Sequence, residues 1–305
     1  MSQPLDRVLN QVSRIILGKE HQIRLALSCL LAGGHLLIED IPGVGKTTLA
    51  HALAATLGLN FQRIQFTSDL LPADIIGVSV FDHEQASFKF HPGPIFTQVL
   101  LADEVNRATP KTQSALLEAM EERQVTTEGE TRPLPEPFFV IATQNPSYQV
   151  GTFPLPESQL DRFLMRIQLG YPGADAERAL LQGTSRRDLL SRLDPCMNAE
   201  ELAELRQGVD RVHTSSALID YLQALIRHTR TAADFASGLS PRAGLALLHA
   251  ARAWALMDGR QEVVPEDVQS VIPGVVGHRL HTSNQHGRVN GVDVAARLID
   301  AVAIP

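Results

Sequence analysis

The sequence predicts an α/β domain built on a parallel sheet and followed by a helical domain. Residues 36–49, LLIEDIPGVGKTTL, have the order of a strand, a glycine-bearing loop and a helix. Two more apolar runs, at residues 99–102 and 138–142, lack polar alternation, which is typical of strands buried on both faces of a parallel sheet. Later apolar patterns have helical spacing. We therefore expect an α/β core over residues 1–172 and a linker with a helical domain over residues 173–305.

The composition is that of a globular protein. Of the 305 residues, 44% are hydrophobic and 20% are charged, which allows one large or two ordinary domains. The formal net charge of −7 argues against a protein that charge alone holds on DNA or on an anionic membrane. The apolar segment 25–38 is interrupted by Gly33, Gly34 and His35 and is too short to span a bilayer. We expect neither nucleic-acid binding nor membrane insertion.

The cysteine content and the N-terminus indicate the compartment. Cys29 and Cys196 are the only two cysteines and lie far apart in the sequence, which favours reduced thiols over a disulfide framework or a zinc site. The opening segment, MSQPLDRVLNQVSRI, has mixed charge and lacks the apolar stretch of a secretory signal. We therefore expect a cytoplasmic protein.

Apolar spacing and turn residues predict the elements of the first domain. Thr109 and Pro110 form a good helix start, because a hydroxyl cap precedes a proline in the first turn. Polar stretches with Pro and Gly at residues 74–94 and 124–137 are typical of exposed hairpins inserted between buried elements. In chain order we expect helices at 5–12 and 23–31, a strand at 36–38, a helix at 49–57, a strand at 61–66, a hairpin at 74–94, a strand at 99–102, a helix from 109, a hairpin at 124–137, a strand at 138–142, a helix at 158–163 and a strand at 165–169.

The second domain is predicted to contain helices. Apolar residues share a helical face in two sets: Leu218, Leu222, Leu225 and Ile226, and then Leu245, Leu248 and Ala251. Trp254, the only tryptophan, lies on the second of these helices and is expected in the core. Pro265 opens another helix, and a last one is expected at residues 292–303 after a polar stretch at 281–291.

The loop behind the first strand has the residue types of a phosphate-binding loop. Gly43 and Gly45 allow backbone N–H groups to face a phosphate, and the helix that starts at Lys46 presents unpaired N–H groups. Lys46 can reach the β- and γ-phosphates, and the Thr47 hydroxyl suits Mg²⁺. Asp40 stands where the G-x-x-x-x-G-K-[ST] pattern has its first glycine. A carboxylate near phosphates is unfavourable unless it points away.

Three polar residues follow two further strands of the predicted sheet. Asp103 and Glu104 follow residues 99–102, and Asn145 follows residues 138–142. Ligands of parallel sheets lie beyond the carboxyl ends of the strands. There Asp103 can help to hold Mg²⁺, Glu104 can orient or deprotonate an attacking water, and Asn145 can bind that water or the γ-phosphate. These residues predict phosphoryl-transfer chemistry at one edge of the sheet.

Removal of a γ-phosphate also requires cations besides Lys46. Arg162 lies at the far end of the first domain, where it can serve a neighbouring subunit as an arginine finger. Arg242 opens a helix of the second domain and can reach back to the nucleotide. Arg107 and Arg123 are further candidates, and the sequence leaves open whether either shares the role of Arg162.

Other chemistry has little support in the sequence. The eleven histidines have no metal-ligand spacing, and His278 and His281 lack a third ligand. His35 stands at the start of a strand and is expected to be structural. A Gly-x-Ser-x-Gly or Cys/His nucleophile arrangement does not occur.

Together these stretches resemble the AAA+ ATPases, and among them the MoxR family. The resemblance covers roughly residues 15–280 and rests on six motifs in the family's order: Glu39-Asp-Ile-Pro-Gly-Val-Gly-Lys-Thr47, Leu101-Ala-Asp-Glu-Val-Asn-Arg107, Lys111-Thr-Gln-Ser-Ala-Leu-Leu-Glu-Ala-Met-Glu-Glu-Arg-Gln-Val125, Ala142-Thr-Gln-Asn-Pro146, Leu160-Asp-Arg-Phe163 and Ser240-Pro-Arg242. Asp40 departs from the general phosphate-loop consensus but is similar to this family's own variant.

The resemblance implies a fold and an assembly. The fold would be a P-loop AAA+ core, a parallel five-stranded sheet in the order 5-1-4-3-2 with helices on both faces, followed by an all-helical lid domain. Residues 74–94 would be the insert in the second helix, and residues 124–137 the hairpin before the sensor strand. Subunits would form homo-oligomeric rings, expected to be hexamers, with ATP and Mg²⁺ at the interfaces and Arg162 acting in trans. Ring size and threading of a client stay open.

The resemblance also implies a function and a set of site residues. Members are considered chaperone-like remodellers or assembly factors of protein clients, often with a partner that carries a von Willebrand factor A domain. Catalytic roles would fall to Glu104, Asn145, Arg162 and Arg242, and Mg²⁺ would be held by Thr47 and Asp103. The ATP-binding residues would be Ile16 and Leu17 near the adenine, and Pro42, Gly43, Val44, Gly45, Lys46, Thr47 and Thr48 at the phosphates.

Several alternatives remain at the level of sequence. A nucleotide-dependent scaffold that does not hydrolyse ATP would bind tightly without turnover, although Glu104, Asn145 and Arg162 are all present. A nucleic-acid motor of the MCM type shares the two hairpins, but the acidic charge argues against it. A small-molecule kinase would need an acceptor pocket, and a GTPase would need an Asn-Lys-x-Asp guanine reader, which does not occur.

Overall fold

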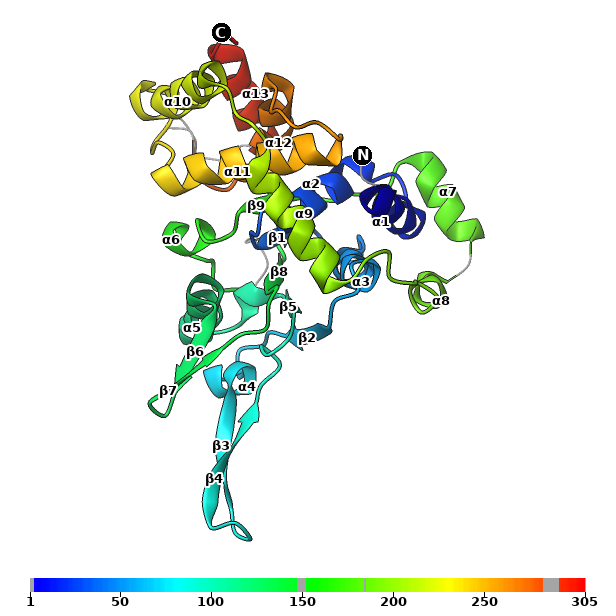
Figure 1. The fold of residues 1–305 in the computed structure, drawn as a ribbon, viewed down its shortest axis with the longest axis vertical. Helices are drawn as coiled ribbons and strands as arrows, with labels where there is room; N and C mark the ends of the chain where they lie inside the picture. The colour runs from blue at the N-terminus through cyan, green and yellow to red at the C-terminus, as the bar shows by residue number, and fades with distance from the viewer. Residues whose placement is uncertain (1–2, 147–151, 184, 282–290, 305) are drawn as a thin grey trace.

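A parallel five-stranded sheet organises the first half of the chain (Figure 1). The computed structural model describes residues 3–146, 152–183, 185–281 and 291–304. The sheet has the order β2-β5-β8-β1-β9, and its strands are β1 (Leu36–Glu39), β2 (Phe61–Gln65), β5 (Val99–Asp103), β8 (Phe139–Gln144) and β9 (Met165–Ile167). All four neighbouring pairs are parallel. Counted along the chain, this is the predicted order 5-1-4-3-2.

Helices cover both faces of the sheet. Because successive strand residues point to opposite faces, Leu36 and Ile38 pack in one core with α1 (Gln3–Ile15), α2 (Glu20–Leu31) and α3 (Lys46–Thr56). Leu37 packs on the other side, with α5 (Pro110–Glu122) and the short α4 (Pro72–Ile76). This double burial explains why β1, β5 and β8 are apolar without alternation.

One buried histidine joins three elements at the amino edge of the sheet. His35 precedes β1, accepts a hydrogen bond from Val140 N at its Nδ1 (2.9 Å) and donates from Nε2 to Met120 O near the end of α5 (3.1 Å). Burial lowers its pKa to about 4, so the imidazole is neutral near pH 7. The expected structural role of His35 is therefore consistent with its contacts.

Two antiparallel hairpins are inserted in the core. The first consists of β3 (Gly77–Asp82) and β4 (Ser87–Pro92), and it extends from the body at the end opposite the helical domain (Figure 1). Its predicted start at residue 74 is shifted, because residues 74–76 form the last turn of α4. The second hairpin consists of β6 (Gln124–Thr127) and β7 (Glu130–Pro133).

Helices make up the chain beyond the sheet. The short α6 (Glu157–Leu160) precedes β9, and then follow α7 (Ala174–Gln182), α8 (Arg186–Leu190), α9 (Ala199–Arg211), α10 (Ser216–Thr231), α11 (Pro241–Met257), α12 (Pro265–Val276) and α13 (Gly291–Ala301). The core that contains α2 and α3 continues into α9, α11 and α12. Within the described residues, no helix is long and apolar enough to cross a membrane.

The buried face of α11 differs from the predicted one. Leu245 is 59% exposed, whereas Leu247, Ala251 and Trp254 are buried. The helix is apolar around most of its circumference, so spacing alone did not identify the face that packs on α2. Apart from His281 and Gly291, the polar stretch at 281–291 lies outside the described residues.

Candidate active site at the carboxyl edge of the sheet

The phosphate-type loop connects β1 to α3. Gly43 and Gly45 have φ angles of 85° and 98°, in the left-handed region where a Cβ is strained, and Gly45 caps the helix that begins at Lys46. A Cβ on Gly45 would lie 3.7 Å from Cδ1 of Ile16, so Ile16 borders the loop. The helix N-terminus and the two glycines together form an anion-binding turn.

Asp40 points away from the space inside this loop. Its Oδ1 accepts a hydrogen bond from Ile41 N (2.8 Å), and its Oδ2 accepts from Leu169 N and Gly170 N (both 2.6 Å). The carboxylate is therefore satisfied by three backbone N–H groups, one in the loop and two just after the last strand of the sheet. Its bonds to Leu169 and Gly170 give the acid at the position of the first consensus glycine a structural partner.

Lys46 lies across the loop and contacts the neighbouring strand. Its Nζ donates to the backbone oxygen of Asp40, to Ile41 O (3.2 Å) and to Oδ1 of Asn145 (3.0 Å). Burial lowers the pKa of Lys46, while the nearby Asp40 and Asp103 oppose that shift. The ammonium is thus held by groups that an anionic ligand in the loop would replace.

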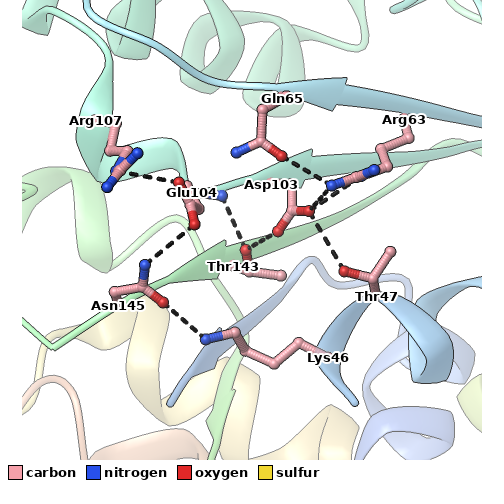
Figure 2. A network of polar contacts seen from close by, with 9 residues as sticks. All are labelled: Lys46, Thr47, Arg63, Gln65, Asp103, Glu104, Arg107, Thr143 and Asn145. Atoms are coloured by element: carbon pink, nitrogen blue, oxygen red, sulfur yellow. Dashed lines mark hydrogen bonds and ion pairs between the residues drawn. The ribbon is translucent and has the colours of Figure 1, made fainter. Parts of the chain in front are cut away.

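Asp103 lies at the end of β5 and faces the start of α3. Its Oδ1 accepts from the hydroxyl of Thr143 (2.5 Å), and its Oδ2 accepts from the hydroxyl of Thr47 (3.3 Å). Figure 2 shows that Arg63 also reaches this carboxylate from β2. Hydroxyl and carboxylate oxygens are the ligands that Mg²⁺ prefers, so the donor set between Thr47 and Asp103 fits that ion.

Glu104 has an unusual backbone conformation that aims its side chain. Its φ angle is 57°, which is uncommon for a non-glycine residue, and its N–H donates to Thr143 Oγ1 (2.9 Å). Glu104 Oε1 accepts from Asn145 Nδ2 (3.2 Å), and Oε2 pairs with Arg107 Nε (3.1 Å). A continuous polar chain therefore runs from Lys46 through Asn145 to Glu104 (Figure 2).

Two of the predicted arginines meet at a single carboxylate elsewhere. Glu121, near the end of α5, pairs through Oε2 with Arg162 Nε (3.1 Å) and through Oε1 with Arg242 at the start of α11. With Met120, these three residues line a pocket. The structure thus brings Arg242 to Arg162 and does not bring it to the phosphate-type loop.

The arginine pair lies at the opposite edge of the sheet from the loop. Met120, the neighbour of Glu121, contacts His35 immediately before β1, whereas the loop begins where β1 ends. The four residues of β1 separate the two edges by roughly 13 Å along the strand. Both arginines therefore lie at the amino edge, apart from the Lys46 loop of their own chain.

The helical domain fixes the segment that carries Arg162. Arg279, only 6% exposed in its side chain, pairs with Asp161 Oδ1 (2.6 Å) and donates to the backbone oxygens of Asp161 (3.0 Å) and Phe163 (2.7 Å). His278 donates from its Nε2 to the same Phe163 oxygen (3.1 Å). The residues on both sides of Arg162 are therefore held by the lid side of the molecule.

Comparisons with known proteins agree with this geometry. Residues 35–165 match the model of the ATPase family associated with various cellular activities (AAA), and residues 227–298 match that of the AAA lid domain. The chain is 39% identical over 312 residues to Chaperone MoxR1 of Mycobacterium tuberculosis, covering 99% of this chain and 82% of that one. The chain belongs to the MoxR family of AAA+ ATPases.

Two further relatives match the MoxR-type chain over nearly its whole length. Uncharacterized protein YeaC of Bacillus subtilis is 42% identical over 303 residues, with 99% of this chain and 95% of that one covered. A crystal structure from Cytophaga hutchinsonii superimposes with a TM-score of 0.90 at 35% identity, covering 99% and 95% of the two chains. The AAA+ core and helical lid are therefore the fold of this MoxR-family chain, and nucleotide binding follows from its family.

The MoxR-type site contains residues that the sequence did not predict. Thr143 joins Asp103 to Glu104, Arg63 pairs with Asp103, and Glu121 joins Arg162 to Arg242. A sequence signal existed for Thr143, because it lies two residues before Asn145 and belongs to the same motif, residues 142–146. The Arg63 and Glu121 contacts link strands and helices that are distant in the chain, which single-motif reasoning does not reach.

Proposed function

We propose that this MoxR-family chain binds Mg²⁺-ATP at the Lys46 loop and hydrolyses it to ADP and phosphate. The observation that supports hydrolysis best is the polar chain from Lys46 through Asn145 to Glu104. It connects the residue suited to the γ-phosphate with a carboxylate that can take a proton. A protein that only bound nucleotide would not need Glu104 in a strained backbone conformation that directs its carboxylate to Asn145.

Each residue has a defined part in the proposed reaction. A water held beside Glu104 and Asn145 attacks the γ-phosphorus and gives its proton to the Glu104 carboxylate. The bond between the γ-phosphorus and the bridging oxygen breaks, and ADP leaves with the electron pair. Lys46 exchanges its contacts with Asn145 and the loop carbonyls for contacts with the β- and γ-phosphates. Ile16 and Leu17 border the proposed adenine position, and Thr48 follows in the first turn of α3.

The metal ion of the proposed reaction would be held by Thr47 and Asp103. Bound there, Mg²⁺ would supply positive charge to the phosphate oxygens. Thr143 keeps Asp103 in position through its hydroxyl, and the same hydroxyl accepts the N–H of Glu104. The metal-binding and proton-accepting carboxylates therefore depend on one threonine.

The location of the arginines supports a site completed by a second copy. Arg162 and Arg242 lie together at the amino edge, away from the loop of their own chain. In a ring, which we propose to be a hexamer, this edge of one subunit would face the loop of the next. Arg162 would then stabilise the transition state in trans, a role worth roughly 10³- to 10⁵-fold in rate. Arg107 is engaged by Glu104, and Arg123 follows α5 near the same edge as Glu121.

We propose that ATP hydrolysis drives chaperone-like remodelling or assembly of a protein client in the cytoplasm. One relative is named a chaperone, and in this chain the first hairpin exposes Val80 (51%) and Phe88 (74%), which suit contact with a client. A partner with a von Willebrand factor A domain is part of this proposal. The working division is an ATPase core over residues 1–172 and a linker with the lid over residues 173–305.

The first experiment is Mg²⁺-ATP turnover per subunit at increasing protein concentration, with Glu104→Gln alongside. We expect turnover per subunit to rise with concentration and to fall by about 10²- to 10⁴-fold in the variant while ADP binding is retained. Glu118→Gln, an exposed acid on α5, is the matched control. ATP binding without turnover would instead support a nucleotide-dependent scaffold. Turnover independent of concentration in a protein that sizing shows to be monomeric would reject the trans role of Arg162.

A further inference from the structure

The Asp103 oxygen that accepts from Thr47, Oδ2, has no vacant acceptor position in this structure. A carboxylate offers about four lone-pair sites, two on each oxygen. Asp103 accepts four hydrogen bonds: one from Thr143 at Oδ1, and three at Oδ2 from Thr47 (3.3 Å), Arg63 Nε (3.0 Å) and Arg63 Nη2 (2.6 Å). Two of the four come from one guanidinium. The oxygen nearest Thr47, which fits the metal, is thus occupied by an arginine.

Sheet register directs Arg63 to this oxygen. Gln65 lies directly opposite Asp103 in the β2–β5 ladder, and Arg63, two residues earlier, points to the same face of the sheet. Gln65 Oε1 accepts a hydrogen bond from Arg63 Nη2 (2.8 Å), which orients the guanidinium towards Asp103 (Figure 2). The contact is therefore built from two elements and a supporting amide.

We propose that Arg63 is the resident counter-cation of Asp103 in the nucleotide-free protein, and that it leaves Oδ2 when Mg²⁺-nucleotide binds. The inference rests on the proposed nucleotide site and adds to it a residue that sets its metal requirement. Arg63 and Mg²⁺ compete for one oxygen, since a guanidinium that donates twice to Oδ2 and a divalent ion do not share the same lone pairs.

The exposure of the two partners makes this exchange feasible. The Asp103 side chain is 9% exposed, so a buried carboxylate without a cation would be costly in the free protein. The Arg63 side chain is 48% exposed, and its guanidinium can move into water at little cost. Arg63 therefore neutralises Asp103 when nucleotide is absent, and Mg²⁺ replaces it when nucleotide binds.

One consequence distinguishes this role from that of an ordinary ion pair. Removal of the guanidinium should increase the apparent affinity for Mg²⁺, because the competitor is gone. A residue that merely supported the fold or oriented Asp103 would have the opposite effect, since its loss would weaken metal binding. The sign of the change therefore decides between the two roles.

The test is a Mg²⁺ titration of fluorescent ADP binding, read by anisotropy at a fixed ADP concentration. For Arg63→Met we expect the half-saturating Mg²⁺ concentration to fall roughly fivefold, as for loss of a half-exposed ion pair. Arg63→Lys keeps a cation without the bidentate fork and should lie between the variant and the unsubstituted chain. Reversible partial unfolding of a variant would raise the midpoint and so could not mimic the expected fall, and urea unfolding of each variant shows whether such a rise contributes.

Arg260→Met is the matched control, because Arg260 is likewise part-exposed (35%) and pairs with the buried Asp267 in the helical domain. It should leave the Mg²⁺ midpoint unchanged. An unchanged or higher midpoint in Arg63→Met would overturn the proposal for Arg63 while ADP binding itself persists. If the unsubstituted chain failed to bind ADP at any Mg²⁺ concentration, the proposed function would fall, and the Arg63 exchange with it.

Discussion

The two edges of the sheet both pair arginines with a carboxylate, but in reversed settings. At the carboxyl edge the acid is buried and Arg63 is half-exposed, and Asp103 is fixed by further bonds from Thr143 and Thr47. At the amino edge Glu121 is more exposed, at 34% of its side chain, and the segment around Arg162 is fixed by Arg279. The fold thus fixes the carboxylate at the carboxyl edge and the arginine-bearing segment at the amino edge.

This difference teaches which member of each pair carries the chemistry. A group held by several independent contacts is positioned in advance, whereas a group held by one exposed partner can change partners. By this criterion we propose that Asp103 acts at the carboxyl edge and that Arg63 holds its place. At the amino edge the contacts of Arg279 fix the backbone on both sides of Arg162, and we propose that Arg162 acts there while Glu121 holds its guanidinium. The two edges would then be complementary halves of one site.

The largest expected effect is on turnover and comes from removing Arg162 at the amino edge. Arg162→Ala should lower turnover by about 10³-fold, because charge that develops on the transferred phosphoryl group loses its cation, while fluorescent ADP binding stays unchanged. Mixing this variant with Lys46→Ala should restore part of the activity, since some interfaces then combine an intact loop with an intact arginine. Failure of all mixing ratios to restore activity would place Arg162 in the site of its own chain.

A smaller effect tests the histidine that joins α5 to the sheet. The folded-state pKa of His35 is about 4, below its ordinary value of about 6.5, so the unfolded chain binds more protons between these values. Stability from this group is complete above pH 6.5 and is lost as the pH falls towards 4. At pH 5 we expect the free energy of unfolding to be lower than at pH 7 by about 2 kcal/mol from His35.

Urea unfolding at the two pH values measures this difference, with His35→Gln as the comparison. The variant should be less stable at pH 7 because its contacts with Val140 and Met120 are altered. It should also lose the part of the pH dependence that comes from His35. An identical pH dependence in both proteins would contradict a neutral imidazole at this position.

The smallest expected effect concerns Glu121, the residue that pairs with the arginines at the amino edge as Arg63 pairs with Asp103 at the carboxyl edge. Glu121→Gln removes the negative charge shared by Arg162 and Arg242, and turnover should fall by roughly fivefold through loss of a partly exposed ion pair. Glu122→Gln is the matched control, because Glu122 is the exposed neighbour of Glu121. A rise in turnover would mean that Glu121 restrains the arginines. Where loss of Arg63 should favour metal binding, loss of Glu121 should impair catalysis.

Local sequence predicted the carboxyl edge better than the amino edge. Lys46, Asp103, Glu104 and Asn145 each lie within eight residues after a recognisable apolar run, and the structure brings them together. The parallel sheet order followed from family resemblance and is confirmed. Contacts at the amino edge join residues more than a hundred positions apart, such as Glu121 with Arg242 and Asp161 with Arg279. Such pairs depend on how the lid packs, which spacing along one helix does not encode.

The predicted buried face of α11 was wrong for a related reason. Leu245 has the expected spacing with Leu248 and Ala251 but is exposed. Most of the buried residues of α11 are alanines, and small residues allow neighbouring helices such as α2 to approach closely. Hydrophobic size was therefore a poor guide where close packing, rather than burial of large side chains, determined the interface.

The carboxylate of Asp40 gives the phosphate-type loop a mechanical role. Its two 2.6 Å bonds end on Leu169 and Gly170, where the chain leaves the sheet on its way to the helical lid. Asp40 also supplies the backbone oxygen that Lys46 contacts. Asp40 thus connects the loop to the segment by which the chain leaves the sheet. Any displacement of the first loop residue either moves the base of the lid or breaks both of these bonds.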